Sequence, residues 1–63
     1  MRYYRLYFLD TGGDIEHFRE FEAVSDLYAL RQAAQWRGPE AMELWSGARK
    51  VRDWDSIAPT SAP

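Results

Sequence analysis

The sequence predicts an α+β domain in which two β-hairpins flank one helix, in the order ββαββ. The turn residues Asp10-Thr11-Gly12-Gly13-Asp14 separate two segments rich in aromatic residues, as in a hairpin. Helical spacing of apolar residues follows Ser25 and stops at Gly38-Pro39. A second pair of short strand-like segments meets at Gly47-Ala48. Together these signals account for almost the whole chain.

The first hairpin is expected to pair residues 3–9 with residues 15–23, around a two-residue turn at Gly12-Gly13. This register sets six pairs opposite one another: Tyr3/Glu22, Tyr4/Phe21, Arg5/Glu20, Leu6/Arg19, Tyr7/Phe18 and Phe8/His17. A slip by one residue would set Arg5 against Arg19, so the first register is favoured. A longer loop of the same parity would keep the same pairs.

The helix is expected to begin at the N-cap Ser25, with Asp26 favourably placed in its first turn. Gly38 is the expected C′ residue, and Pro39 prevents the helix from continuing. An apolar stripe is expected to face the sheet through Leu27, Leu30, Ala33 and Ala34. The opposite side would carry Tyr28, Arg31, Gln32 and Gln35.

The second hairpin is expected to pair residues 41–46 with residues 49–54 through a type II′ turn that begins at Gly47. The expected pairs are Leu44/Val51, Glu43/Arg52 and Trp45/Lys50. We expect one mainly antiparallel sheet in the order 2-1-3-4; an order with strand 4 beside strand 1 would have the same local signals.

Size and composition indicate a single folded domain over residues 1–54, followed by a flexible tail over residues 55–63. The chain has 63 residues, ten aromatic side chains, no cysteine, one histidine and a formal charge of −2. A core of this size supplies only about 3–5 kcal/mol, and disulfides are excluded, so self-association is the expected additional source of stability. The lack of a long apolar run or a secretory signal predicts a cytoplasmic protein.

The two registers sort the side chains onto two faces of the sheet. The more aliphatic face is expected under the helix, with Tyr4, Leu6, Phe8, Ile15, Phe21, Met42, Leu44 and Val51. The other face would stay uncovered. Its expected contact residues are Tyr3, Arg5, Tyr7, Phe18, Trp45, Lys50, Arg52 and Trp54, beside Leu9 and the acidic Glu16, Glu20, Glu22 and Glu43. An exposed patch of this composition is typical of an interaction site.

Catalytic and metal-binding interpretations are weaker than their structural alternatives. His17 would need an orienting carboxylate, with Asp10 or Asp14 across the turn as candidates, but a strand histidine is the simpler interpretation. The acidic side chains share their face with Arg5, Lys50 and Arg52, which favours a solvated surface of mixed charge. The Asp10–Asp14 loop lacks the spacing of a calcium loop, and its glycines precede a strand and not a nucleotide-binding helix. We therefore expect no enzyme, no cofactor and no metal.

Residues 3–54 also resemble a small family of alphaproteobacterial proteins. The resemblance rests on Tyr3-Tyr4-Arg5-Leu6-Tyr7-Phe8-Leu9-Asp10, on Gly12-Gly13 and Ile15, on Phe21-Glu22-Ala23 before an alanine-bearing helix, and on Glu43-Leu44-Trp45 with Val51. It implies the same order of elements and a bacterial cytoplasmic protein. It implies no activity and no catalytic residue.

The leading functional hypothesis is a non-enzymatic interaction module that forms a homodimer, or binds another protein, through its uncovered sheet face. The alternative is a module for single-stranded nucleic acid, in which aromatic side chains on that face stack on bases and Lys50 and Arg52 contact phosphates. The glutamates on the face and the acidic net charge oppose this alternative.

Overall fold

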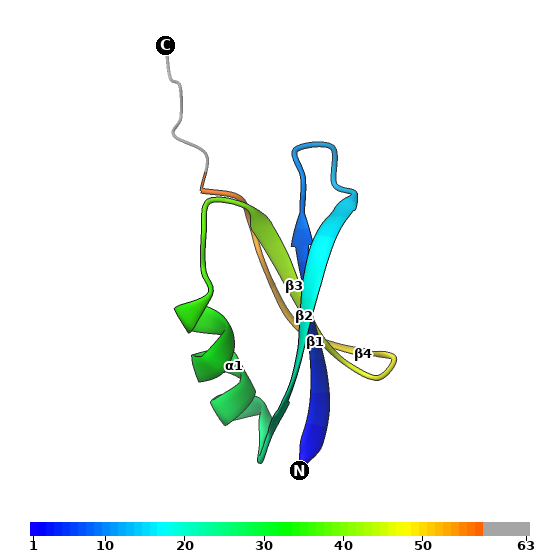
Figure 1. The fold of residues 1–63 in the computed structure, drawn as a ribbon, viewed down its shortest axis with the longest axis vertical. Coiled ribbons are helices and arrows are strands. Elements are labelled where there is room, and N and C mark those ends of the chain that lie inside the picture. Colours follow the sequence, from blue (N-terminus) through cyan, green and yellow to red (C-terminus); the bar gives the residue numbers. More distant parts are fainter. Residues whose placement is uncertain (58–63) are drawn as a thin grey trace.

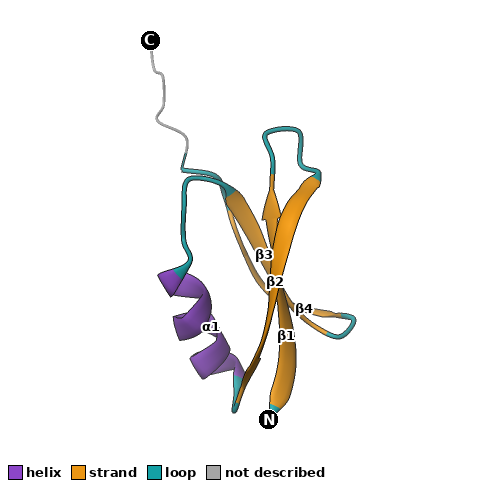
Figure 2. Ribbon diagram, viewed as in Figure 1, coloured by secondary structure: helices purple, strands orange, loops and turns teal. Residues whose placement is uncertain are grey.

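The computed structural model describes residues 1–57 and confirms the ββαββ order. The elements are β1 (Arg2–Leu9), β2 (Ile15–Ala23), α1 (Asp26–Gln35), β3 (Ala41–Ser46) and β4 (Arg49–Trp54). The strands form one open antiparallel sheet in the expected order β2-β1-β3-β4. Helix α1 stands on one side of this sheet (Figures 1 and 2). The other side is bare over the described part of the chain.

The core lies between α1 and the sheet. Its buried side chains are Tyr4, Leu6, Phe8, Ala23, Ala29, Ala33, Met42 and Leu44. Alternate residues of β1 and β3 enter it, because successive side chains of a strand point to opposite faces. The helix contributes its two fully buried residues as alanines, Ala29 and Ala33, so its backbone comes close to the strands.

The helix begins as expected and ends earlier than expected. Ser25 accepts a hydrogen bond from the Tyr28 N–H at 3.4 Å and is the N-cap. The helix stops at Gln35, with Trp36 as its C-cap, and Gly38 does not adopt the positive φ of a C′ glycine. The prediction for Gly38 was therefore wrong.

The buried stripe of the helix is rotated relative to the prediction. Ala29 and Ala33 are buried and Leu30 is half-buried, whereas Leu27 is 58% exposed and Ala34 is exposed. The larger Leu27 was expected to face the sheet. The close approach of the helix leaves space there only for alanine side chains.

The first hairpin keeps the predicted strand register but reaches it through a different turn. All six predicted pairs from Tyr3/Glu22 to Phe8/His17 are present. The Gly13 N–H donates to the Asp10 carbonyl, Gly13 has φ +87°, and Leu9 then pairs with Ile15, which leaves a bulge at Glu16. The predicted two-residue turn was therefore wrong. The longer loop with its bulge keeps the same strand pairs and is the alternative that the sequence left open. Beyond the bulge Ile15 is 57% exposed and not in the core, contrary to expectation.

The second hairpin also contains a bulge, and this one changes the faces. Gly47 has φ +63° and Ala48 does not have a positive φ, as the predicted type II′ turn requires. The predicted Trp45/Lys50 pair is present. Beyond it an extra residue, Val51, shifts the register. Leu44 then pairs with Arg52, Glu43 with Asp53, and Met42 with Trp54. The predicted pairs Leu44/Val51 and Glu43/Arg52 were therefore wrong.

Residues 55–57 continue beyond β4 along the loop that precedes β3. The Ile57 N–H donates to the Pro39 carbonyl at 2.8 Å, and Arg37 donates to the Asp55 carbonyl. The rest of the expected tail, residues 58–63, lies outside the described residues. None of the helical segments that the structure describes has the length and apolar character needed to cross a membrane.

Asp26 joins the start of the helix to two strands. The buried Tyr4 hydroxyl donates to its carboxylate at 2.6 Å, and Arg49 of β4 donates two hydrogen bonds at 3.0 and 3.1 Å. Arg2 approaches the same carboxylate at 3.5 Å. The hydrogen bonds from Arg49, and then from Tyr4, lower the pKa of Asp26 from its ordinary 3.8 to about 2.

We predict that Asp26→Asn lowers the stability of the fold in a pH-dependent way. The folded pKa is depressed, so the contribution of Asp26 is fully present well above pH 3.8 and is lost as the pH falls toward about 2. Urea unfolding midpoints of the native chain and of the variant should differ at neutral pH and converge near pH 2. Asp14→Asn, in the exposed first turn, is the control and should track the native chain. A constant gap between Asp26→Asn and the native chain would contradict the linkage.

Candidate interaction face on the uncovered side of the sheet

The face of the sheet opposite α1 carries two ladders of side chains that cross all four strands. We call this surface the open face, with the residues Tyr3, Arg5, Tyr7, Phe18, Glu20, Glu22, Glu43, Trp45, Lys50 and Asp53. The pairings align Glu20, Arg5, Trp45 and Lys50 as a first row. They align Phe18, Tyr7, Glu43 and Asp53 as a second row. Glu22 and Tyr3 lie beside the first row.

Arg5 is the centre of the aromatic part of the open face. Its guanidinium forms an ion pair with Glu20 and lies 4.9 Å from the ring centroid of Phe18. It also donates a long hydrogen bond, 3.4 Å, to the Tyr7 hydroxyl. Tyr7 and Phe18 have ring centroids 6.1 Å apart at a tilt of 55°. Arg5 therefore orients both aromatic side chains, while 42% of its own side chain stays exposed.

A second group of contacts surrounds Trp45. Its indole N–H donates to the Glu43 carboxylate at 3.0 Å. The Lys50 ammonium lies 6.0 Å from the Trp45 ring centroid and forms an ion pair with Asp53 at 3.2 Å. Lys50 remains 41% exposed despite both contacts. The half-buried Trp45 is therefore fixed in orientation and presents part of its ring to the surroundings.

The aromatic side chains leave a shallow hollow between the two groups. It has a volume of about 220 Å³ and is lined by Tyr3, Arg5, Tyr7, Trp45 and Gly47. Tyr3 is 52% exposed and Phe18 is 50% exposed. The open face thus combines rigid, accessible rings with charges of both signs, a composition enriched in protein interfaces.

Glu20 is held in its charged form by two neighbours. The neighbouring Tyr3 hydroxyl lowers the pKa of Glu20 most, and the Arg5 guanidinium of the ion pair lowers it further. The same contact with Glu20 raises the pKa of Tyr3. The first row therefore keeps its acidic end ionised.

Six of the eight predicted contact residues lie on the open face, and two do not. The register places Tyr3, Arg5, Tyr7, Phe18, Trp45 and Lys50 together there. Arg52 and Trp54 pair with Leu44 and Met42, whose side chains are buried under the helix. Trp54 packs against the core, with the Arg52 guanidinium 5.4 Å from its ring centroid. The bulge at Val51 moves both to the helix side, so their expected placement was wrong.

Asp53 takes the place on the open face that the prediction gave to Arg52. The exchange follows from the bulge, and the alternation of residues in the sequence does not indicate where a bulge will form. The sequence also does not indicate the contact of Arg49 with Asp26, since the residues are far apart in sequence and the expected pairings do not bring them together.

His17 lies on the helix side of the sheet, opposite Phe8 of β1. Its ring stacks on Phe8 with centroids 4.4 Å apart and an angle of 12° between the planes. Asp10, one expected partner, instead accepts hydrogen bonds from the N–H groups of Gly12 and Asp14. In residues 1–57 no hydrogen bond joins His17 to a carboxylate. The strand interpretation of His17 fits these contacts.

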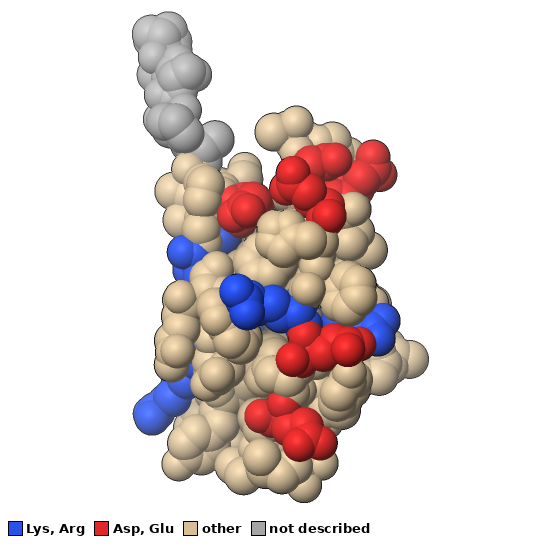
Figure 3. Space-filling model, viewed as in Figure 1, with Lys and Arg blue, Asp and Glu red and all other residues tan. Residues whose placement is uncertain are grey.

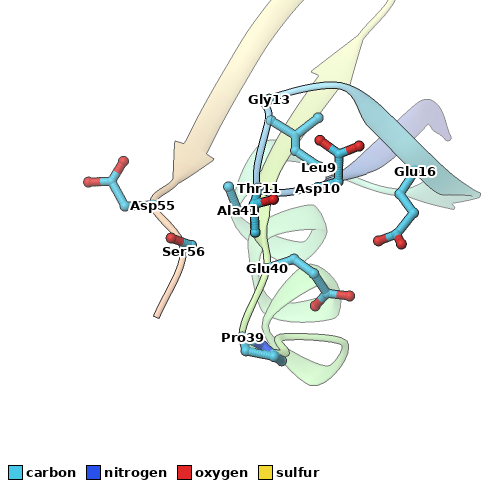
Figure 4. A pocket seen from close by; sticks show the side chains of 10 residues that line it. All are labelled: Leu9, Asp10, Thr11, Gly13, Glu16, Pro39, Glu40, Ala41, Asp55 and Ser56. Atoms are coloured by element: carbon cyan, nitrogen blue, oxygen red, sulfur yellow. The ribbon is translucent and has the colours of Figure 1, made fainter. Parts of the chain in front are cut away.

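A larger hollow at the end of the molecule has an acidic lining. Its volume is about 770 Å³, and its residues are Leu9, Asp10, Thr11, Gly13, Glu16, Pro39, Glu40, Ala41, Asp55 and Ser56. Figure 3 shows acidic side chains gathered at this end. In Figure 4 the carboxylates come from separate segments, and Asp55 points away from the others. Among the described residues, no three or more His, Asp or Glu side chains are grouped so that they could hold a metal ion.

Comparisons of this chain with protein-family models, with curated proteins and with solved structures find no match. The resemblance to alphaproteobacterial proteins therefore stays a prediction, and the site is interpreted from its own geometry.

We predict that Tyr3→Phe and Arg5→Gln each raise the pKa of Glu20 toward its ordinary 4.5, because each removes a group that favours the carboxylate. Tyr3→Phe should have the larger effect. Carboxyl chemical shifts followed through an NMR titration would measure both changes. Arg52→Gln is the matched control, since Arg52 lies on the other side of the sheet, and should leave Glu20 unchanged. If neither face variant moved the titration, the three groups would not meet in solution.

Proposed function

We propose that this protein is a non-enzymatic interaction module of the bacterial cytoplasm that self-associates through the open face. The observation that carries the proposal is the open face itself. Two ordered rows of aromatic and charged side chains lie on a side of the sheet that no element within residues 1–57 covers. A surface of this kind on a small domain is typical of an interaction site.

The small core supports self-association as the use of this face. Among the described residues eight hydrophobic side chains are buried, and three of them are alanines. A domain of this size is marginally stable alone, and a second copy that binds only the folded state adds stability by mass action. The resemblance to alphaproteobacterial proteins supports the bacterial setting.

The extent of the face indicates a weak association. Four strands about 4.8 Å apart and about 20 Å long give an area of roughly 280 Å² between the outer strands, which is small beside the about 800 Å² per partner of a standard interface. We therefore expect dissociation constants in the micromolar range or above.

We predict that Trp45→Ala weakens self-association by roughly thirtyfold or more, because central aromatic anchors dominate interface energies. Sedimentation equilibrium of the native chain and the variant would measure the change. Trp54→Ala removes the same side chain from the helix side and is the matched control, with circular dichroism to confirm that both variants fold. A native chain that stays monomeric at high micromolar concentration would overturn the proposal.

The nucleic-acid alternative loses support from the register of β4. Arg52 and Trp54, two of its expected contacts, lie on the helix side. The remaining cations of the open face, Arg5 and Lys50, each already contact a carboxylate, and the face carries four acidic residues against these two. Phosphate binding would have to displace the existing ion pairs.

We predict no binding of single-stranded RNA or DNA at low salt, measured by fluorescence anisotropy with labelled oligonucleotides of mixed sequence. The acidic charge of the face repels the phosphates, and low salt strengthens that repulsion. An affinity that falls with salt and is lost in Lys50→Ala would instead establish the alternative function.

A further inference from the structure

We infer the symmetry of the proposed dimer from the order of charges on the open face: two copies pack face to face about a twofold axis that runs parallel to the strands, between β1 and β3. This inference rests on the proposed self-association and specifies its geometry. In this arrangement Glu20 of each copy lies over Lys50 of the other, and Arg5 lies over Trp45 of the other.

The first row of one copy is complementary in charge to the first row of a second copy that runs in the opposite direction across the sheet. Across the sheet it reads acid, base, aromatic, base through Glu20, Arg5, Trp45 and Lys50. A twofold axis parallel to the strands reverses this order, so β2 of one copy covers β4 of the second and β1 covers β3. The reversed row then sets an acid over a base at both ends, and a guanidinium over an indole ring twice near the axis.

The columns of side chains along the strands lead to the same arrangement. On the open face β1 carries one base, Arg5, and β3 carries one acid, Glu43, so these columns have opposite net charge. The β2 column has two acids, Glu20 and Glu22, whereas the β4 column has Lys50 and Asp53 and is neutral. Placing β1 over β3 and β2 over β4 therefore avoids contact between columns of like charge.

A twofold axis perpendicular to the strands is disfavoured by the same charges. It would place β2 of one copy over β2 of the second, so that the acidic columns face each other. Edge-to-edge pairing of β2 is disfavoured as well. A symmetric antiparallel pair centred on Phe18 would set Glu16 opposite Glu20, and centres at Arg19 or Glu20 would set like charges directly opposite.

The groups required for these contacts remain accessible in the single chain. Arg5 and Lys50 keep 42% and 41% of their side chains exposed, and Glu20 keeps 36%. Their internal ion pairs orient them and leave the outer sides free for a second copy. Because packed sheets lie about 10 Å apart, long side chains from both copies meet midway between them.

Charge reversal tests the axis. Glu20→Lys alone sets a positive charge at position 20 against Lys50 at both ends of the dimer, and Lys50→Glu alone sets an acid against Glu20. Each variant should therefore self-associate about tenfold more weakly than the native chain. In a mixed dimer of the two variants, native Glu20 lies over native Lys50 at one end. At the other end the two substituted positions face each other, again with opposite charges. Heterodimers should therefore form in preference to either homodimer. Sedimentation with a distinct fluorophore on each variant measures both quantities.

The controls separate the failure of this geometry from the failure of self-association. Arg31→Glu and Asp14→Lys reverse charges away from the open face and should show neither weakening nor preference for each other. A native chain that stays monomeric would overturn the proposed function and the axis together. A native dimer whose charge variants show no preference for each other would overturn the axis alone. Self-association strengthened by Glu20→Lys would indicate the perpendicular axis instead.

Cross-linking gives a second measurement that does not depend on reversing a charge. The chain has no cysteine, so Glu20→Cys and Lys50→Cys introduce single reactive sites. In the proposed dimer positions 20 and 50 of different copies lie about 10 Å apart, whereas positions 20 of the two copies lie about 17 Å apart. A short bis-maleimide should therefore link the mixed variants and not Glu20→Cys alone. Cross-linking of Glu20→Cys to itself would contradict the axis.

Discussion

Within residues 1–57, one helix of ten residues limits the fold, because it can cover only one side of the four-stranded sheet. The strands place Tyr4, Leu6 and Leu44 on the covered side, where they are fully buried. The helix approaches them through Ala29 and Ala33, which allow close contact and exclude larger side chains. The opposite side keeps its rings and charges at the surface for the same reason. The core and the open face therefore have the same origin, which is that α1 covers one side of the sheet and leaves the other side exposed in the described residues.

The position of the helix depends on a polar contact at its first turn. Asp26 accepts hydrogen bonds from Tyr4 on a central strand and from Arg49 on an edge strand. Because the two donors come from strands that do not pair with each other, one carboxylate connects the helix to both halves of the sheet. Asp26 also lies near the positive end of the helix dipole, which favours its charge. At the other end, Trp36 packs against Phe21 with ring centroids 5.2 Å apart.

Alternation and turn chemistry predict most of the fold, and the bulges account for most of what they miss. The six pairs of the first hairpin follow from parity, and parity holds whether the loop is tight or contains a bulge at Glu16. The second hairpin has no such protection, since the bulge at Val51 comes after the turn and reverses the faces of every later residue. With this bulge Trp54 packs against the core, a tertiary contact that the local sequence pattern does not contain. The prediction that Leu27 faces the sheet was also wrong. Helical spacing identifies the apolar side of a helix, but it does not determine how closely that side approaches the sheet.

The bulge at Val51 also decides the chemical character of the open face. Without it, Arg52 would stand beside Lys50 and Trp54 would add a further ring, which is the pattern of a surface for nucleic acid. With it, Asp53 takes that place and forms an ion pair with Lys50. The surface then has two of its four acids on β2 and its accessible cations on β1 and β4. Such an uneven distribution favours a partner that presents the same charges in reverse order, and a second copy of this chain presents them in that order.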